Sequence, residues 1–162
     1  MSWASEFYAT KTVVITGGTS GIGQGIGRAF ADAGAVVHVT GATQAEVETG
    51  AAVEPRFRYT QLDVRNSEQV AEYAATFGSV SALVNCAGVN LRAAEHTVDG
   101  FATVIDINLN GSMRTAYAFK EDLSGFGKVY EYRFNTGELK DPLVDIAQQN
   151  GWGWKGVAFG KL

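Results

Sequence analysis

A glycine-rich stretch near the N-terminus has the residue types and spacing that bind phosphate groups. Residues 16–23 read Thr-Gly-Gly-Thr-Ser-Gly-Ile-Gly, between a run of β-branched residues and a segment with helical periodicity. Glycines permit a tight turn and let a phosphate approach the main chain closely. Backbone N–H groups and the positive end of the helix dipole then bind the anion. The context predicts a phosphate site here rather than an ordinary connecting turn.

Three further polar residues stand where parallel strands and their following helices place functional groups. Asp63 follows a predicted strand, Asn85 ends the next one, and Asn108 lies on a predicted helix. Each has a structural alternative. Asp63 is also placed to cap the helix that begins near residue 66, Asn85 is a common turn residue, and Asn108 by itself is an ordinary polar helix residue.

The remaining candidates for chemistry are weaker. Cys86 is interpreted as a small buried residue, because no basic residue close in sequence would activate its thiolate. His38 lies within a predicted strand, and His96 is alone on a predicted loop. Neither has the spacing of a metal ligand, so no metal site is predicted.

The elements that must position these residues alternate between strand and helix from residue 12 to about residue 119. The first predicted helix carries Ile22, Ile26, Ala29, Phe30 and Ala33 at helical spacing, and Gly34 ends it. Strands are predicted at 12–16, 36–40, 57–62 and 82–86, and helices at 22–33, 44–50, 67–77 and about 99–119. This alternation with short links predicts an α/β fold whose parallel sheet is built by right-handed crossovers.

The pattern changes beyond about residue 122, which predicts a domain of residues 1–122 followed by a tail of residues 123–162 of unrecognised origin. Residues 129–134 alternate aromatic and charged side chains, as in a half-exposed strand, 135–137 form a turn, and 142–150 a short helix. The tail is expected to pack on the sheet edge. Trp152 and Trp154 either cover that edge or form an interface that makes a homo-oligomer, and both alternatives stay open.

Four motifs together resemble the short-chain dehydrogenase/reductase family over residues 11 to about 117. They are the glycine loop, Leu-Asp-Val at 62–64, Asn-Cys-Ala-Gly at 85–88, and Asp-Ile-Asn-Leu-Asn-Gly at 106–111. The resemblance implies a Rossmann-like sheet with helices on both faces, incomplete on its C-terminal side, and a nicotinamide dinucleotide as the ligand. It assigns cofactor binding to Gly17, Thr19, Ser20, Gly21, Ile22, Gly23, Asp63, Val64, Asn85, Ala87 and Gly88, and a catalytic role to Asn108.

The choice between NAD and NADP depends on the end of the second strand. An acid there binds the ribose diol of NAD, and a basic residue accommodates the phosphate of NADP. The resemblance places these residues at Gly41 and Ala42, and neither carries a charge. Thr40 and Thr43 are potential donors, and Arg28 would add positive charge. NAD and NADP both stay open, with a slight preference for NADP.

The family's catalytic pair, Tyr-x-x-x-Lys, does not occur in this sequence. Tyr117 and Lys120 are one residue too close, as are Tyr8 and Lys11 at an N-terminus expected to fray. If residues 127–134 formed the fifth strand, the Tyr and Lys positions would fall near residues 147 and 151. We therefore expect NAD(P) binding with weak or no hydride transfer.

Two alternatives remain. One is an active oxidoreductase in which Tyr130 or Tyr132, beside Lys128, replaces the missing tyrosine. The other is a non-catalytic interaction or assembly module.

Composition excludes several other classes of protein. The chain has 162 residues and a net charge of −4, which argues against nucleic-acid and anionic-membrane partners. No apolar run approaches the ~18 residues of a membrane span. The single cysteine fits a reducing compartment, and residues 1–10 lack the pattern of a secretory signal. A cytoplasmic protein acting on a small molecule of unspecified class is expected.

Overall fold

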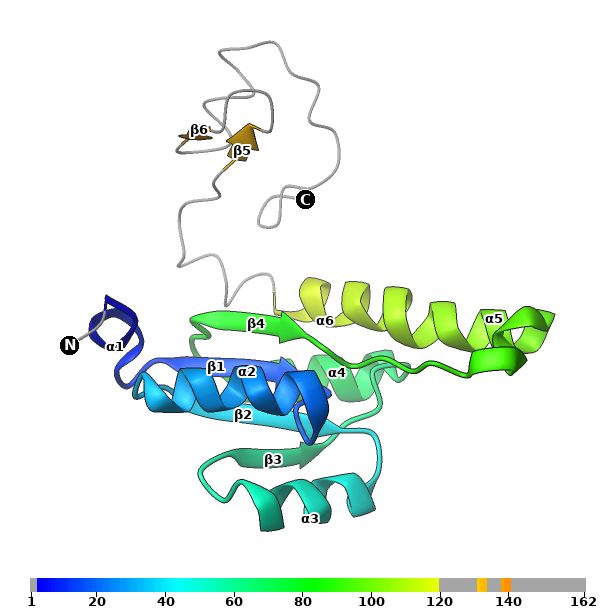
Figure 1. Ribbon diagram of the computed structural model, residues 1–162, viewed down its shortest axis with the longest axis horizontal. Coiled ribbons are helices and arrows are strands. Elements are labelled where there is room, and N and C mark those ends of the chain that lie inside the picture. Colours follow the sequence, from blue (N-terminus) through cyan, green and yellow to red (C-terminus); the bar gives the residue numbers. More distant parts are fainter. Residues whose placement is uncertain (1–2, 120–130, 134–137, 141–162) are drawn as a thin grey trace.

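The computed structural model describes residues 3–119, 131–133 and 138–140. Strands and helices alternate through the first of these ranges, as predicted (Figure 1). The strands are β1 (Thr12–Thr16), β2 (Val36–Gly41), β3 (Arg58–Gln61) and β4 (Ala82–Asn85). The helices are α1 (Trp3–Tyr8), α2 (Gly21–Asp32), α3 (Gln44–Val53), α4 (Ser67–Ala74), α5 (Val98–Ile105) and α6 (Ser112–Ala118), with a 3₁₀ turn, η1 (Arg92–His96), and a π-helical segment, η2 (Asp106–Gly111).

The four strands form one parallel sheet in the order β3-β2-β1-β4. Val13 of β1 pairs with Val37 of β2 on one side and with Ala82 of β4 on the other. The chain runs outward from β1 to β3 and returns to the other side of β1 with β4, so the switch point lies between β1 and β4. Open α/β sheets bind ligands at this point, beyond the carboxyl ends of the strands. The predicted α/β class with a Rossmann-like parallel sheet is confirmed.

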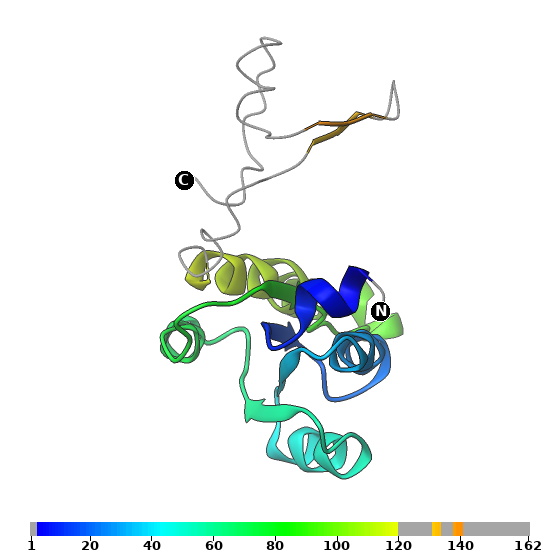
Figure 2. The ribbon, with the colours of Figure 1, turned by 90° about the vertical axis from the view of Figure 1, so that its left-hand side faces the viewer.

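Helices cover both faces of the sheet (Figure 2). One apolar cluster joins β1 and β2 to α1 and α2, and includes Ile15, Val39 and Phe30. The opposite cluster joins Val14 of β1 to α4 and the end of α6, with Phe119 fully buried. The run of β-branched residues in β1 is therefore buried on both faces, which is what a central parallel strand requires.

The segment that precedes β1, for which the sequence predicted no helix or strand, contains α1. Tyr8, in α1, packs edge-to-face on Phe30 of α2 with ring centroids 4.9 Å apart. Thr10 donates its backbone N–H to the Gly34 carbonyl at 2.8 Å. A helix of six residues depends on tertiary contacts such as these, which the local sequence pattern does not reveal.

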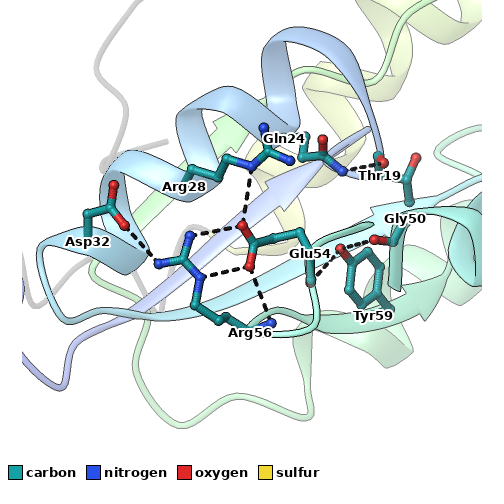
Figure 3. Close-up of polar contacts among 8 residues, drawn as sticks. All are labelled: Thr19, Gln24, Arg28, Asp32, Gly50, Glu54, Arg56 and Tyr59. Atoms are coloured by element: carbon teal, nitrogen blue, oxygen red, sulfur yellow. Dashed lines mark hydrogen bonds and ion pairs between the residues drawn. The ribbon is translucent and has the colours of Figure 1, made fainter. Parts of the chain in front are cut away.

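A charged cluster fixes α2 to the segment that precedes β3 (Figure 3). We call Arg28, Asp32, Glu54 and Arg56 the Glu54 cluster. The Glu54 carboxylate, only 8% exposed, accepts hydrogen bonds from Arg56 Nε at 2.7 Å and from Arg28 Nε at 3.2 Å. Arg56 also donates to Asp32 at 2.7 Å. The hydrogen bonds from Arg56, followed by that from Arg28, lower the pKa of Glu54 to about 2.

In the C-terminal region, β5 (Glu131–Arg133) and β6 (Glu138–Lys140) form a separate antiparallel pair. The strand predicted at 129–134 is therefore present, but it is not a fifth strand of the parallel sheet. The predicted helix at 142–150, Trp152, Trp154 and the packing of the tail lie outside the described residues. Within the described part of the chain, no helix is long and apolar enough to cross a membrane.

Candidate functional site

The carboxyl ends of the sheet strands and the loops that follow them surround a cavity of about 370 Å³. The strand-to-helix loop after β1 forms one wall. The end of β2 with the start of α3, and the loops after β3 and β4, form the others. Its lining residues are Gly17, Ser20, Gly21, Ile22, Gly23, Thr40, Ala42, Glu46, Leu62, Asp63, Val64, Arg65, Cys86, Ala87, Gly88, Val89 and Ile107. The motifs that the sequence singled out thus converge on one place.

The glycine loop needs glycine for two different reasons. Gly17 and Gly21 have φ angles of +64° and +53°, in the left-handed region that glycine adopts at low cost. Gly23 is required by close approach, because a Cβ there would lie 2.4 Å from the Gly17 carbonyl oxygen. The backbone N–H of Gly18 donates to the Thr40 carbonyl at 3.1 Å and ties the loop to β2. The loop is therefore a compact turn held against the sheet.

The N-terminus of α2 has no side-chain cap. Ser20 is its N-cap residue, and the Ser20 side chain makes no capping hydrogen bond. In contrast, Thr43, Asn66 and Thr97 cap α3, α4 and α5 with side-chain oxygens. The first N–H groups of a helix lack intrahelical partners and carry the positive end of the dipole. At α2 these groups remain available to an anion in the cavity.

Ile22 is an exception to the apolar pattern of the first predicted helix, because it faces the cavity and not the sheet. Ile26 and Phe30 pack against the sheet as predicted, but Ile22 is 79% exposed and lines the cavity. The face that α2 buries near its start consists of Gly23, Gln24 and Gly27. A Cβ at Gly27 would lie 2.7 Å from the Phe57 ring, so small residues let the helix approach the sheet.

Thr40 contributes a buried hydroxyl without a partner. Its side chain is 1% exposed, and no described group forms a hydrogen bond with its Oγ1. Buried hydroxyls are normally paired, because an unpaired one costs about 1–3 kcal/mol. Since Thr40 lines the cavity at the end of β2, its hydroxyl is placed to bind a polar atom of a ligand.

Asp63 lies at the opposite wall and is paired with Arg65. Arg65 Nε donates to both carboxylate oxygens of Asp63 at 3.0 Å, and the Arg65 backbone N–H donates to Oδ1 at 3.0 Å. The side-chain hydrogen bonds from Arg65 are the main cause that lowers the pKa of Asp63. The carboxylate therefore stays ionised at the cavity and retains acceptor capacity, since its side chain is 31% exposed.

A set of polar contacts holds the loop after β4. The Thr16 hydroxyl accepts from the backbone N–H groups of Cys86 and Ala87, each at 3.3 Å. The Asn85 amide accepts from the Thr115 hydroxyl at 2.6 Å, and its nitrogen donates to the Ser112 carbonyl at 3.4 Å. Asn85 thus positions β4 against α6 rather than lining the cavity.

Asn108 fixes the same loop from the π-helical segment. Its Oδ1 accepts from the Val89 N–H at 2.8 Å, and its Nδ2 donates to the Val89 carbonyl at 3.0 Å. A Cβ at Gly88 would lie 3.3 Å from Oδ1 of Asn108, so glycine allows this approach. The sequence predicted one uninterrupted helix here. The structure instead has a π turn at Asp106–Gly111, a feature that often occurs at functional sites.

The structure brings the predicted cofactor residues to the cavity except Thr19 and Asn85, and the predicted catalytic residue Asn108 does not line the cavity either. Thr19 is buried, and its backbone carbonyl accepts from Gln24 (Figure 3). Asn85 and Asn108 hold neighbouring loops, as described above. Arg28, considered in the sequence as a source of positive charge, belongs to the Glu54 cluster and does not line the cavity.

Sequence reasoning did not name Glu46 or Arg65 as cavity residues. Arg65 lies two positions after Asp63, and that spacing was the available signal. For Glu46 the signal was the spacing Thr43-x-x-Glu46, which is typical of a helix capping box.

Known proteins match the part of the chain that contains the sheet and the cavity. Residues 11–129 match the family model described as short chain dehydrogenase. The chain belongs to the short-chain dehydrogenase family.

Among curated members of this family, 2-dehydro-3-deoxy-L-rhamnonate dehydrogenase (NAD(+)) of Sphingomonas sp. is 32% identical over 159 residues, covering 88% of this chain. L-fucose dehydrogenase of Oryctolagus cuniculus is 36% identical over 65% of this chain. The chain spans 61% of the first relative's length and 39% of the second's.

Solved structures of the family agree with the fold. A short chain dehydrogenase from Bacillus anthracis superposes with a TM-score of 0.64 at 31% identity, covering 76% of this chain and 54% of its own. One from Leptospira borgpetersenii, solved with bound NAD+, superposes with a TM-score of 0.66 at 24% identity, covering 78% of this chain and 51% of its own.

Proposed function

We propose that this chain binds a nicotinamide dinucleotide in the cavity at the carboxyl ends of its strands. The observation that carries the proposal is the uncapped N-terminus of α2, which meets the cavity at a loop of glycines. The pyrophosphate would lie on the backbone N–H groups of this loop, with Ser20, Gly21, Ile22 and Gly23 nearest to it. This placement uses the general affinity of helix N-termini for phosphate.

The other walls of the cavity suit the rest of the dinucleotide. Asp63 would accept a hydrogen bond from the adenine amino group, with Val64 beside the ring. Ala87 and Gly88 would face the middle of the ligand, and Asn108 would act through the Val89 loop that it holds. The unpartnered Thr40 hydroxyl supports the fit, because a ligand would supply the missing hydrogen bond.

A bound nicotinamide dinucleotide would supply or accept a hydride. We propose that hydride transfer by this chain is weak or absent, because its sequence contains no Tyr-x-x-x-Lys pair. An unperturbed tyrosine titrates near 10 and needs a cationic neighbour to exchange protons at neutral pH. The alternative proton donors Tyr130 and Tyr132 lie outside the residues whose side chains the structure describes.

Both NAD and NADP suit this proposal, since they share the adenine and the pyrophosphate. The preference for NADP depends on the absence of an acid at Gly41 and Ala42, and it stays a prediction. The Sphingomonas relative is named with NAD(+).

Calorimetric titration of the full chain with NADH and with NADPH tests the proposed function. We expect saturable binding of at least one of them with a stoichiometry near one per chain. A carbonyl-substrate screen that follows dinucleotide absorbance should then show little or no turnover. Absence of binding by a chain with an ordinary circular dichroism spectrum would refute the proposed site, and rapid turnover would refute the proposed lack of catalysis.

A further inference from the structure

A carboxylate stands at the end of β2, although the sequence has no acid there. Glu46, on the first turn of α3, accepts a hydrogen bond from the Ala42 backbone N–H through Oε2 at 2.7 Å, and it lines the cavity. In the described part of the chain, its second oxygen, Oε1, has no hydrogen-bond partner. The side chain therefore has an acceptor available beside the strand end that distinguishes NAD from NADP.

Gly41 explains why the acid comes from the helix. A Cβ at this position would lie 2.7 Å from the Thr19 methyl group and 3.2 Å from Oε2 of Glu46. An aspartate or glutamate at residue 41 would therefore collide with its surroundings. Glu46 occupies the corresponding space from the next element instead.

The balance of charge around the cavity makes Glu46 the decisive group. Among the described lining residues, the charged ones are Glu46, Asp63 and Arg65. Arg65 is engaged with Asp63, and Arg28 is engaged with Glu54. No described lining residue offers an uncommitted cation to a ribose phosphate, and a phosphate would meet the Glu46 carboxylate.

We propose that Glu46 accepts hydrogen bonds from the hydroxyls of the adenosine ribose and selects NAD over NADP. This proposal depends on the proposed function of the cavity, and it reverses the preference for NADP drawn from residues 41 and 42. A carboxylate is an acceptor only, which suits the diol of NAD. The 2′-phosphate of NADP would bring like charges together and remove one hydroxyl donor.

The alternative role for Glu46 is purely structural, as part of the cap of α3. The test must therefore use a variant that keeps this cap. Thr43 accepts from the Glu46 N–H at 3.2 Å, as in a capping box, while the Glu46 carboxylate reaches the N–H of Ala42. A glutamine can make the same reach, so Glu46→Gln keeps the cap and removes the charge. Glu48 lies on the same helix and outside the cavity, with its carboxylate bonded to Gln44 at 2.9 Å. Glu48→Gln is therefore the matched control for a change of charge.

The affinities of the full chain for NADH and NADPH, measured by calorimetry, test whether Glu46 selects NAD. The unmodified chain should bind NADH at least about tenfold more tightly than NADPH. Glu46→Gln should bring the two affinities to within about threefold of each other, with an unchanged melting temperature, while Glu48→Gln should keep the original preference.

Each other outcome is informative. Equal affinities in the unmodified chain, a preference for NADPH, or a preference that survives Glu46→Gln would overturn the role of Glu46 and leave dinucleotide binding in place. Failure of the unmodified chain to bind either dinucleotide would overturn the proposed function, and this assignment with it.

Discussion

The two ends of β3 carry the same local arrangement of an acid followed two residues later by an arginine. Glu54 and Arg56 precede the strand, and Asp63 and Arg65 follow it. At the amino end the acid is nearly buried, and guanidinium groups from two elements bind it. At the carboxyl end the acid is 31% exposed, is bound by one arginine, and faces a cavity.

The difference shows that the tertiary surroundings, rather than the local sequence, separate a carboxylate that is bonded within the fold from one that faces a cavity. The Glu54 carboxylate has its hydrogen-bonding capacity used within the fold, where it joins α2 to β3 (Figure 3). Asp63 leaves acceptor capacity toward a ligand. Variants that damage one end should therefore leave the function of the other intact.

The largest effect is expected from Gly23→Ala at the carboxyl end. The added Cβ would lie 2.4 Å from the Gly17 carbonyl oxygen and displace the loop. A steric cost of about 1–3 kcal/mol corresponds to a loss of about 5- to 150-fold in dinucleotide affinity, measured by calorimetry. The control variant is Gly25→Ala, because a Cβ at residue 25 meets no atom within 4 Å. That change should stabilise α2 by up to about 1 kcal/mol and leave the dinucleotide affinity unchanged. Equal affinities in both variants would contradict the assignment of the loop.

Glu54→Gln and Asp63→Asn form a crossed pair that tests the comparison directly. Glu54→Gln should lower the melting temperature markedly and leave dinucleotide affinity nearly unchanged, because it removes the charge that holds Arg28 and Arg56. Asp63→Asn should weaken dinucleotide binding by about tenfold and change the melting temperature much less. Calorimetry measures the dinucleotide affinity of both variants, and thermal melts measure their melting temperatures. If both variants change these two quantities to the same extent, the two ends of β3 do not have distinct roles.

Asn108→Ala should have a smaller effect, confined to the loop after β4. The change removes both hydrogen bonds to Val89, at a cost of about 1–2 kcal/mol. Hydrogen exchange at the Val89 amide should become faster, while the amides of β2 keep their protection. Asn110→Ala is the comparison variant, since the Asn110 side chain donates a hydrogen bond to Asp106 and, among the described residues, makes none to Val89. Unchanged exchange at Val89 would contradict the positioning role of Asn108.

The smallest expected difference between the two ends of β3 lies in how the stability of the fold depends on pH. The folded pKa of Glu54 is lowered to about 2, and that of Asp63 is lowered as well. A depressed folded pKa contributes stability that is present above the unfolded pKa, near 4.5 for glutamate, and is lost as the pH falls toward the folded value. Thermal melts should therefore show falling stability between about pH 4.5 and pH 2. Glu54→Gln should flatten this dependence more than Asp63→Asn, and an equal slope in both variants would argue against the greater role of Glu54.

The order of the elements and the glycine loop were predictable because their signals are local. Runs of β-branched residues mark strands buried on both faces, and glycines mark turns that other residues make only under strain. The sequence of 162 residues thus determined the parallel sheet, the crossovers and the position of the glycine loop. It also determined Asp63 and Ala87 as members of one edge, since carboxyl ends of parallel strands meet there.

Only the tertiary structure decided where individual side chains point. Arg28 is 26 residues from Glu54, and the packing of α2 on the sheet brings them together. Glu46 reaches the end of β2 because α3 lies beside that strand, and Ile22 is exposed because glycines form the buried face of α2. Such contacts depend on how close and at what angle the elements pack, and residue spacing along the chain does not carry that information.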